Sequence, residues 1–174
     1  MWMPKGRKPL RIFTRNLRSS KDERIAVFGA VNLETGKVHR FTAPAINQVT
    51  FLTFLKRIVN YYTKKYPDRP VYMVIDGHPA HRARVVTEWV ESQAQFFFYW
   101  LPKNSPEINP IEYFWKKLRG EVTHDYLYNT LKSLKSALTR FFDRWYHKWR
   151  VLKEWVLSLV QKIWKQDNLL IYVG

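Results

Sequence analysis

The chain has 174 residues, a length that suits one domain with a core of its own. Its 30 Lys and Arg residues against 14 Asp and Glu give a formal charge of +16, which favours a polyanionic partner such as nucleic acid. The absence of cysteine excludes disulfides and thiolate zinc sites, and no apolar run approaches the roughly 20 residues of a membrane-spanning helix.

The first segment, residues 1–24, is strongly basic and contains two prolines. Its eight Lys and Arg residues stand against Asp22 and Glu23. Two interpretations remain open: an arm that lies along a phosphate backbone, or a solvated tail that stays unpacked. Because Met1 is followed by basic residues rather than by the apolar stretch of a signal peptide, we expect a cytoplasmic, nucleoid-associated protein.

Residues 25–75 have the pattern of two strands, a helix and a third strand. Residues 25–33 are mostly apolar, end in a Glu-Thr-Gly turn and are followed by an extended pattern over residues 37–41, which predicts a β-hairpin. Apolar residues at helical spacing predict a helix over residues 47–63. The apolar run at residues 71–75 follows two prolines and predicts a buried strand that leads into Asp76.

The next segment places an aromatic strand between two helices. Residues 80–92 have a helical pattern, and residues 96–100 (Phe-Phe-Phe-Tyr-Trp) predict a short strand. A proline-rich loop over residues 101–110 follows. Another helix opens at Glu112 and is expected to close near Gly120, since glycine commonly ends helices.

Residues 121–173 contain neither Gly nor Pro, and a three-four apolar spacing predicts one long amphipathic helix or two in succession. The apolar positions are Leu131, Leu134, Leu138, Phe142, Trp145, Trp149, Leu152, Val156, Leu159 and Ile163. Such a helix either packs on the sheet with a solvated basic face, or faces DNA or a dimer partner. Residues 169–173 are expected to add an edge strand. We expect residues 1–120 to form the α/β part and residues 121–174 a helical extension of the same domain.

Two acidic residues carry the strongest functional signal. Asp76 ends a strand and Glu112 opens a helix, and in an α/β fold such strand ends and helix starts converge on one face. Hard divalent cations take carboxylate oxygens, and two metals about 3.5 to 4 Å apart assist displacement at a phosphodiester. In so basic a chain, the two carboxylates predict a metal site that acts on nucleic acid, with a third carboxylate on an earlier strand.

Each acidic residue also has an ordinary structural interpretation. Asp before Gly is common at turns, where the carboxylate bonds to local amides. Glu112 falls at the third helical position after Asn109, where a capping-box partner sits. These interpretations remain open beside the metal site.

Histidine and basic residues surround the two carboxylates in sequence. His78 and His81 stand three apart beside Asp76, but a zinc site needs at least three protein ligands, so we expect His81 to orient a carboxylate or a phosphate. Positive charge suited to a DNA backbone comes from Lys103, Lys116, Lys117 and Arg119.

Two motifs carry a resemblance to a known family. Residues 76–81 (Asp-Gly-His-Pro-Ala-His) resemble the second-aspartate motif of DDE transposases of the mariner superfamily and their bacterial insertion-sequence relatives. Residues 105–115 (Ser-Pro-Glu-Ile-Asn-Pro-Ile-Glu-Tyr-Phe-Trp) are similar to that family's third-carboxylate motif, at matching spacing. The resemblance spans the chain from about Trp2 to Arg119.

The resemblance implies an RNase H-like α/β fold, a mixed sheet flanked by helices, with three carboxylates that bind two Mg²⁺ or Mn²⁺ ions. It also implies a DNA endonuclease and strand-transfer enzyme, in which water and then a freed 3′-hydroxyl attack phosphodiesters. By the same resemblance, Asp76 and Glu112 match catalytic metal ligands and His81 matches a recurrent histidine. Gly77 departs from the asparagine of many relatives.

In relatives the first aspartate lies on a strand shortly before the segment that resembles residues 2–9, and that strand is the middle one of the sheet. We therefore expect an N-terminally truncated sheet, with a gap and unpaired backbone groups between the hairpin and the strand that ends at Asp76. An upstream transposase portion is the expected source of the missing strand. DNA, as transposon ends and target, and a second copy of the chain are the other expected partners.

Three interpretations of function compete. The first is an active transposase portion that the upstream part completes. The second is an inactive remnant or a non-catalytic basic DNA-binding protein. The third is a basic RNA-binding protein of the ribosomal type, although aromatic RNP strands and a GXXG loop are not evident.

Overall fold

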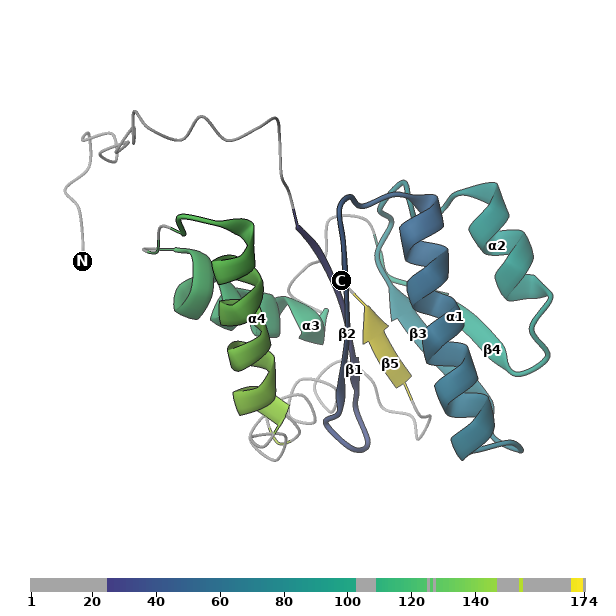
Figure 1. Ribbon diagram of the computed structural model, residues 1–174. Coiled ribbons are helices and arrows are strands. Elements are labelled where there is room, and N and C mark those ends of the chain that lie inside the picture. Colours follow the sequence, from purple (N-terminus) through teal and green to yellow (C-terminus); the bar gives the residue numbers. More distant parts are fainter. Residues whose placement is uncertain are drawn as a thin grey trace.

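The computed structural model describes residues 25–102, 109–124, 126, 128–146, 154 and 170–173 of the chain. In chain order the elements are β1 (Ala26–Asn32), β2 (Val38–Ala43), α1 (Gln48–Lys65), β3 (Val71–Ile75), α2 (Arg84–Glu91), β4 (Phe96–Trp100), α3 (Pro110–Leu118), the π-helical turn η2 (Arg119–Thr123), α4 (Leu131–Tyr146) and β5 (Leu170–Val173). The strands form one five-stranded mixed sheet in the order β2-β1-β5-β3-β4. Helices α1 and α2 lie on one side of this sheet and α3 and α4 on the other (Figure 1).

The predicted hairpin is confirmed as the antiparallel pair β1–β2, which runs from Ala26 opposite Ala43 to Val31 opposite Val38. Gly36 in the connecting turn has a φ of 70°, a left-handed conformation that glycine adopts without steric cost. β2 continues two residues beyond the predicted range, to Ala43.

The predicted helix at residues 47–63 is confirmed as α1, which ends two residues later. Asn47 is its N-cap: the side chain accepts hydrogen bonds from the backbone N–H groups of Val49 and Thr50 at 3.0 Å. The Thr50 hydroxyl in turn accepts from the Asn47 N–H, which completes a capping box. The apolar face of α1 is buried against the sheet through Phe51, Phe54, Leu55, Ile58, Val59 and Tyr62.

Strands β3 and β4 occupy the predicted residues and pair in parallel, with Val71 opposite Phe96 and Ile75 opposite Trp100. The helix between them is shorter than the predicted range of 80–92. It begins only at Arg84, because residues 79–81 form a turn in which the His81 side chain bonds back toward the strand end, and Ala83 is still extended.

The prediction for the last strand is wrong in its position. Residues 170–173 form β5, which lies in the middle of the sheet between β1 and β3 rather than at an edge (Figure 1). β5 runs parallel to β3 and antiparallel to β1. The gap expected between the hairpin and β3 is therefore filled by β5.

Two buried clusters hold the helices to the sheet. The first lies under α1 and α2 and joins Phe28, Met73 and Ile75 of the strands to Phe51 and Val86 of the helices, among others. The second lies under the helices on the opposite face. Its members are Val31, Leu33, Val74, Leu101, Ile111, Phe114, Trp115, Leu118, Val122, Leu138, Phe141, Phe142 and Trp145.

Where the structure describes it, the helical region after Gly120 packs on the sheet and keeps a solvated basic face, which is the first of the two interpretations. Instead of closing at Gly120, α3 continues as η2 through Thr123, and α4 then packs Leu138, Phe141, Phe142 and Trp145 into the second cluster. The basic residues Lys132, Lys135, Arg140 and Arg144 stay exposed. The apolar positions from Trp149 onward lie outside the described residues. In the described part of the chain, no helix is both long and apolar enough to cross a membrane.

Candidate active site

Asp76 lies where the sequence predicts it, directly after the last residue of β3. Its side chain is 45% exposed, and the preceding residues Met73, Val74 and Ile75 are fully buried. The rigid strand therefore fixes the backbone of Asp76 while the carboxylate reaches solvent.

His81 holds one oxygen of this carboxylate. Its Nδ1 lies 2.8 Å from Asp76 Oδ1, and the His78 backbone N–H donates to the same oxygen at 3.0 Å. The His81 ring is buried against Phe51, with ring centroids 4.2 Å apart, so the imidazole has a fixed position. The hydrogen bond from His81 lowers the pKa of the Asp76 carboxyl below its ordinary value, against the opposing effect of burial. The predicted orienting role of His81 agrees with this geometry.

Glu112 lies in the first turn of α3. Asn109 is the N-cap, its side chain accepting from the Ile111 N–H at 3.4 Å, and Pro110 occupies the first helical position. The Glu112 carboxylate is 37% exposed and lies 3.7 Å from the guanidinium of Arg119, on the same helix face two turns later. Its described side-chain contact is thus an ion pair rather than the capping-box bond that the sequence left open.

Strand register relates Asp76 to the part of β1 over which α3 packs. Ala30 of β1 and Ile75 of β3 both pair with Val173 of β5, so Gly29 and Asp76 lie at the next level of the sheet, on either side of the β5 position. Over Gly29 lies the first part of α3. A Cβ built on Gly29 would meet the Trp115 ring at 2.7 Å and Ile111 Cδ1 at 3.6 Å. Residues Ile111 and Trp115 of α3, on either side of Glu112 in the sequence, therefore pack over Gly29.

Trp115 is buried, and its packing explains why α3 lies where it does. The indole is 8% exposed and packs against the one position in β1 that has no side chain. A glycine at that position lets the helix approach the strand closely.

Of the predicted basic residues, Lys116, Lys117 and Arg119 are exposed on α3 and η2, and Lys103 lies outside the described residues. Lys117 Nζ lies 5.6 Å from the centroid of the Tyr113 ring. Arg119 pairs with Glu112, so one of the expected DNA-facing charges is directed at the candidate site itself.

Two residues beside the site were missed by the sequence reasoning. The Arg82 guanidinium covers Gly77, lying 3.1 Å from where a Cβ would be, and also lies 5.2 Å from the ring centroid of Trp100. Trp100 is the last residue of β4 and pairs with Ile75, one residue before Asp76. The available signal was an arginine one residue after His81 and an aromatic residue at a strand C-terminus, where ligands usually bind in α/β sheets.

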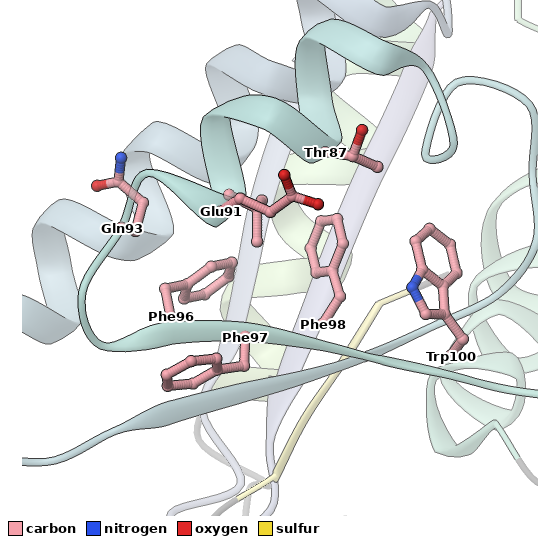
Figure 2. Close-up of a pocket in the computed structure, with 8 residues that line it drawn as sticks. Thr87, Glu91, Gln93, Phe96, Phe97, Phe98 and Trp100 are labelled. Carbon is pink, nitrogen blue, oxygen red and sulfur yellow. The ribbon is translucent and has the colours of Figure 1, made fainter.

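Trp100 also ends an aromatic row along β4. Phe96, Phe98 and Trp100 point to the same side of the strand, and their neighbouring rings lie 6.0 and 5.4 Å apart (Figure 2). Together with Thr87 and Glu91 of α2 they line a groove of about 370 Å³ (Figure 2). Phe96 is buried and Phe98 partly buried, whereas Trp100 is exposed next to Asp76, where an aromatic ring can stack on a base of a single-stranded nucleic acid.

The described residues contain no ready-made cluster of three or more His, Asp or Glu side chains that suits a metal ion. Asp76 and Glu112 are therefore two candidate ligands, and their assignment stays a prediction. The described residues add no third ligand that would support a zinc site beside Asp76: His78 Nδ1 accepts a hydrogen bond from the Ala80 N–H at 3.2 Å, and His81 is engaged with Asp76.

Comparison with known proteins gives a family match and one curated relative. A family model described as DDE superfamily endonuclease matches residues 1–135. The insertion element IS630 uncharacterized 39 kDa protein of Shigella sonnei is 22% identical over 123 residues, which cover 71% of this chain and 35% of the relative. The chain thus spans about a third of the length of that relative.

Solved structures give the fold. The chain is similar to Mos1 transposase in a paired-end complex with the left transposon end, with a TM-score of 0.57, 18% identity, and coverage of 97% of this chain and 51% of that one. It is also similar to the Mos1 transposase catalytic domain with Raltegravir and Mn, with a TM-score of 0.52, 19% identity, and coverage of 77% and 74%. The predicted fold class, an RNase H-like mixed sheet flanked by helices, is confirmed.

Proposed function

Because this chain belongs to the DDE superfamily endonuclease family, we propose that it is the later part of a transposase catalytic domain, with Asp76 and Glu112 as two carboxylates of its metal site. The observation that supports the proposal is the position of α3 on the sheet. Strand register places Gly29 at the level of Asp76, and the two α3 residues that pack over Gly29, Ile111 and Trp115, lie close to Glu112 in the sequence.

The protonation state and hydrogen bonding of the Asp76 side chain suit the binding of a cation. Its Oδ1 is held by His81 and the His78 N–H, whereas Oδ2 has no hydrogen-bond partner among the described residues. The lowered pKa keeps the carboxylate ionised over the physiological range. A partly exposed, ionised oxygen donor is what Mg²⁺ and Mn²⁺ take as a ligand. When bound, two such ions would activate the attacking oxygen and stabilise the leaving oxygen of an in-line displacement.

This chain's own residues would prepare the site for that chemistry. His81 fixes the orientation of Asp76, and the ion pair with Arg119 neutralises the Glu112 carboxylate until cations replace it. Arg82 and the exposed Lys116 and Lys117 supply positive charge for DNA phosphates.

The substrate in this proposal is DNA, as transposon ends and target, cut and rejoined as a strand-transfer reaction. The chain's charge of +16 supports association with DNA and hence with the nucleoid. An upstream portion of the transposase supplies the remaining carboxylate, and a second copy of the assembled protein is a further partner. These whole-protein properties are proposals, since the chain spans only part of its relatives.

The test is Mn²⁺-dependent nicking of supercoiled plasmid by the chain mixed with the polypeptide encoded directly upstream. Nicking should require both parts, and Asp76→Asn or Glu112→Gln should reduce its rate by about a hundredfold or more, because even the partners of metal ligands commonly matter tenfold to a hundredfold. Asp68→Asn, which removes an exposed carboxylate from the turn before β3, is the matched control and should cut normally. Equal nicking by the Asp76 variant would refute the assignment.

The alternative, a basic DNA-binding protein without catalysis, is favoured by the lack of a three-ligand metal cluster among the described residues. It predicts salt-sensitive DNA binding that is indifferent to Mg²⁺ and to Glu112→Gln. A filter-binding or fluorescence-anisotropy titration with and without Mg²⁺ separates the two functions.

A further inference from the structure

A groove lies at the edge of the sheet that is farther from β3. β2 is the first strand in the sheet order, so its outer edge has no strand partner among the described residues. The groove beside it has a volume of about 470 Å³ and is lined by β2, α1 and α4, although the two helices lie on opposite sides of the sheet (Figure 1). We call it the β2 groove, and its lining residues are Arg40, Phe41, Thr42, Arg57, Lys135, Leu138, Thr139 and Phe142.

Aromatic rings position the two arginines of the β2 groove. The guanidinium carbon of Arg57 lies 4.5 Å from the centroid of the Phe41 ring. The corresponding distance from Arg40 to the Phe142 ring is 5.0 Å. Cation–π contacts of this kind restrict a guanidinium without using its N–H donors. Less conformational freedom is therefore lost when those donors bind a ligand.

The β2 groove has a surplus of positive charge. Arg57 and Lys135 are exposed and form no ion pair with any other described residue. Arg40 donates hydrogen bonds to Asp143 Oδ1 at 3.1 Å and to the Thr139 carbonyl at 3.4 Å, and its guanidinium has further donors. Asp143 lies beside the groove and is 64% exposed, whereas none of the lining residues is acidic. A polyanion can neutralise this surplus.

Strand register places the β2 groove in one row with the candidate site. Arg40 pairs with Gly29 of β1, which lies at the level of Asp76. Only β1 and β5 separate β2 from β3, and neighbouring strands are about 4.8 Å apart, so the backbones of Arg40 and Asp76 lie about 14 Å apart across the sheet. At about 3.4 Å for each nucleotide, this distance corresponds to about four nucleotides of a DNA strand.

We propose that the β2 groove binds the phosphate backbone of the DNA duplex about four nucleotides from the phosphodiester at the candidate site. Arg57 and Lys135 supply charge, and Arg40 donates hydrogen bonds to phosphate oxygens. The hydroxyls of the exposed residues Thr42 and Thr139 are further donors. Because phosphate contacts carry no base information, the groove orients the duplex whatever its sequence. This inference rests on the proposed function for DNA as substrate and adds a binding site away from the carboxylates.

The chemistry of the β2 edge favours a phosphate backbone over another strand. An open strand edge can take up a peptide, but charged residues on an edge strand oppose such pairing. The β2 sequence Val-His-Arg-Phe-Thr-Ala places Arg40 in the middle of this edge. A second copy of the chain, with its charge of +16, would bring the same cations to the same edge. Nucleic acid brings the opposite charge.

The experiment compares two double variants of the full chain that lose equal charge. Arg57→Gln with Lys135→Gln removes two cations from the β2 groove. Lys56→Gln with Arg140→Gln removes two cations from the same helices outside the groove, and Lys56 Nζ lies 6.0 Å from the ring centroid of Trp89 in α2. Binding of a fluorescein-labelled duplex of about 20 base pairs is followed by anisotropy between about 50 and 200 mM NaCl, in EDTA.

The groove variant should change both affinity and salt dependence. Loss of two phosphate contacts should reduce the slope of log K against log salt concentration by about 1.8 and weaken binding by about tenfold. The control variant should lose less than about half of either quantity. Equal losses would overturn the proposal, because the attraction would then come from overall charge. Circular dichroism establishes that both variants are folded.

A variant that binds more tightly separates binding from folding, since a misfolded chain would only lose affinity. Asp143→Asn removes the carboxylate bonded to Arg40 and should strengthen duplex binding by about threefold. Asp68→Asn removes an exposed carboxylate from the turn before β3 and should have a smaller effect. Equal effects of the two substitutions would count against the groove.

Cross-linking identifies the occupant of the groove. The chain has no cysteine, so Thr139→Cys places a single thiol in the groove and Ser136→Cys places one on α4 outside its lining. A duplex with a thiol tethered to one phosphate should form a disulfide with the first variant and not with the second. Disulfide-linked protein dimers of the first variant, with no DNA adduct, would instead assign the edge to a second copy.

The absence of metal from these assays separates this inference from the proposed function. Asp76→Asn should leave the difference between the two double variants unchanged. A groove variant that binds DNA normally would refute the groove alone, whereas Mn²⁺-dependent nicking tests the carboxylates. Normal groove binding without any nicking by the reconstituted protein would support the groove and count against the proposed catalysis.

Discussion

The contact between Gly29 and Trp115 yields the sharpest test of the fold at the site. In Gly29→Ala, the new Cβ would lie 2.7 Å from both Cζ2 and Cη2 of the indole. A rigid aromatic ring cannot yield at that distance, so α3 must shift away from β1. Overpacking of this kind costs about 1 to 3 kcal/mol, and replacing glycine by alanine returns about 0.5 to 1 kcal/mol through the unfolded chain.

The expected net loss in the free energy of unfolding is therefore about 0.5 to 2 kcal/mol, or about 2 to 4 °C of Tm per kcal/mol for a domain of this size. Urea unfolding followed by circular dichroism measures it. Trp115→Phe removes Cζ2 and Cη2, so in that background Gly29→Ala should be neutral or slightly stabilising. Gly120→Ala is the matched control, because a Cβ there meets nothing within 4 Å.

The double-mutant cycle decides the interpretation. A coupling of about 1 kcal/mol or more between the two sites is expected for groups in direct contact. If Gly29→Ala lowers the free energy of unfolding equally with tryptophan and with phenylalanine at position 115, then α3 does not pack on this glycine. The close packing of α3 on β1 at Gly29 would then be wrong.

Two further predictions concern titration. Burial and neighbouring lysines lower the pKa of His39 from 6.5 to about 4. Between these two pH values the imidazole is protonated in the unfolded chain but neutral in the folded chain. Stability should fall as pH decreases from about 6.5 to about 4, by up to about 3 kcal/mol, and then level off; His39→Gln should flatten this part of a urea-unfolding pH profile. Separately, His81→Phe keeps the ring packing but removes the 2.8 Å bond to Asp76, so the pKa of that carboxyl should rise in a ¹³C NMR titration. An unchanged titration would show that His81 does not tune the carboxylate.

Helices and strands could be predicted from the sequence where short-range patterns of apolar, turn and capping residues determine them. The apolar runs of β3 and β4 lie between turn residues, and Asn47 caps α1, so their bounds follow from short-range pattern. The Asp-Gly-His-Pro-Ala-His segment misled the expectation for α2, because its polar side chains bond back to Asp76 and form a turn instead of a helix.

The remaining features depend on contacts between distant parts of the chain. The sequence of residues 170–173 does not indicate that they pair with β1 and β3. A short apolar pattern is compatible with a strand at the edge of a sheet and with one in its middle. The approach of Arg82 to Trp100 is likewise set by tertiary placement, whereas the pairing of Glu112 with Arg119 follows from their position on one helix face. The two candidate carboxylates could be picked out from the sequence because each lies in a contiguous motif. The domain boundary near residue 120 stays a prediction.

The late position of β5 in the chain has a consequence for biosynthesis. β1 and β3 leave the ribosome well before residues 170–173 are translated, by roughly 5 to 20 s at about 5 to 20 residues per second. During that interval the two halves of the sheet present facing apolar edges with no strand between them. Such edges are what chaperones bind and what aggregates grow from. The nascent protein therefore passes through a stage at which the central strand position of its sheet is still empty.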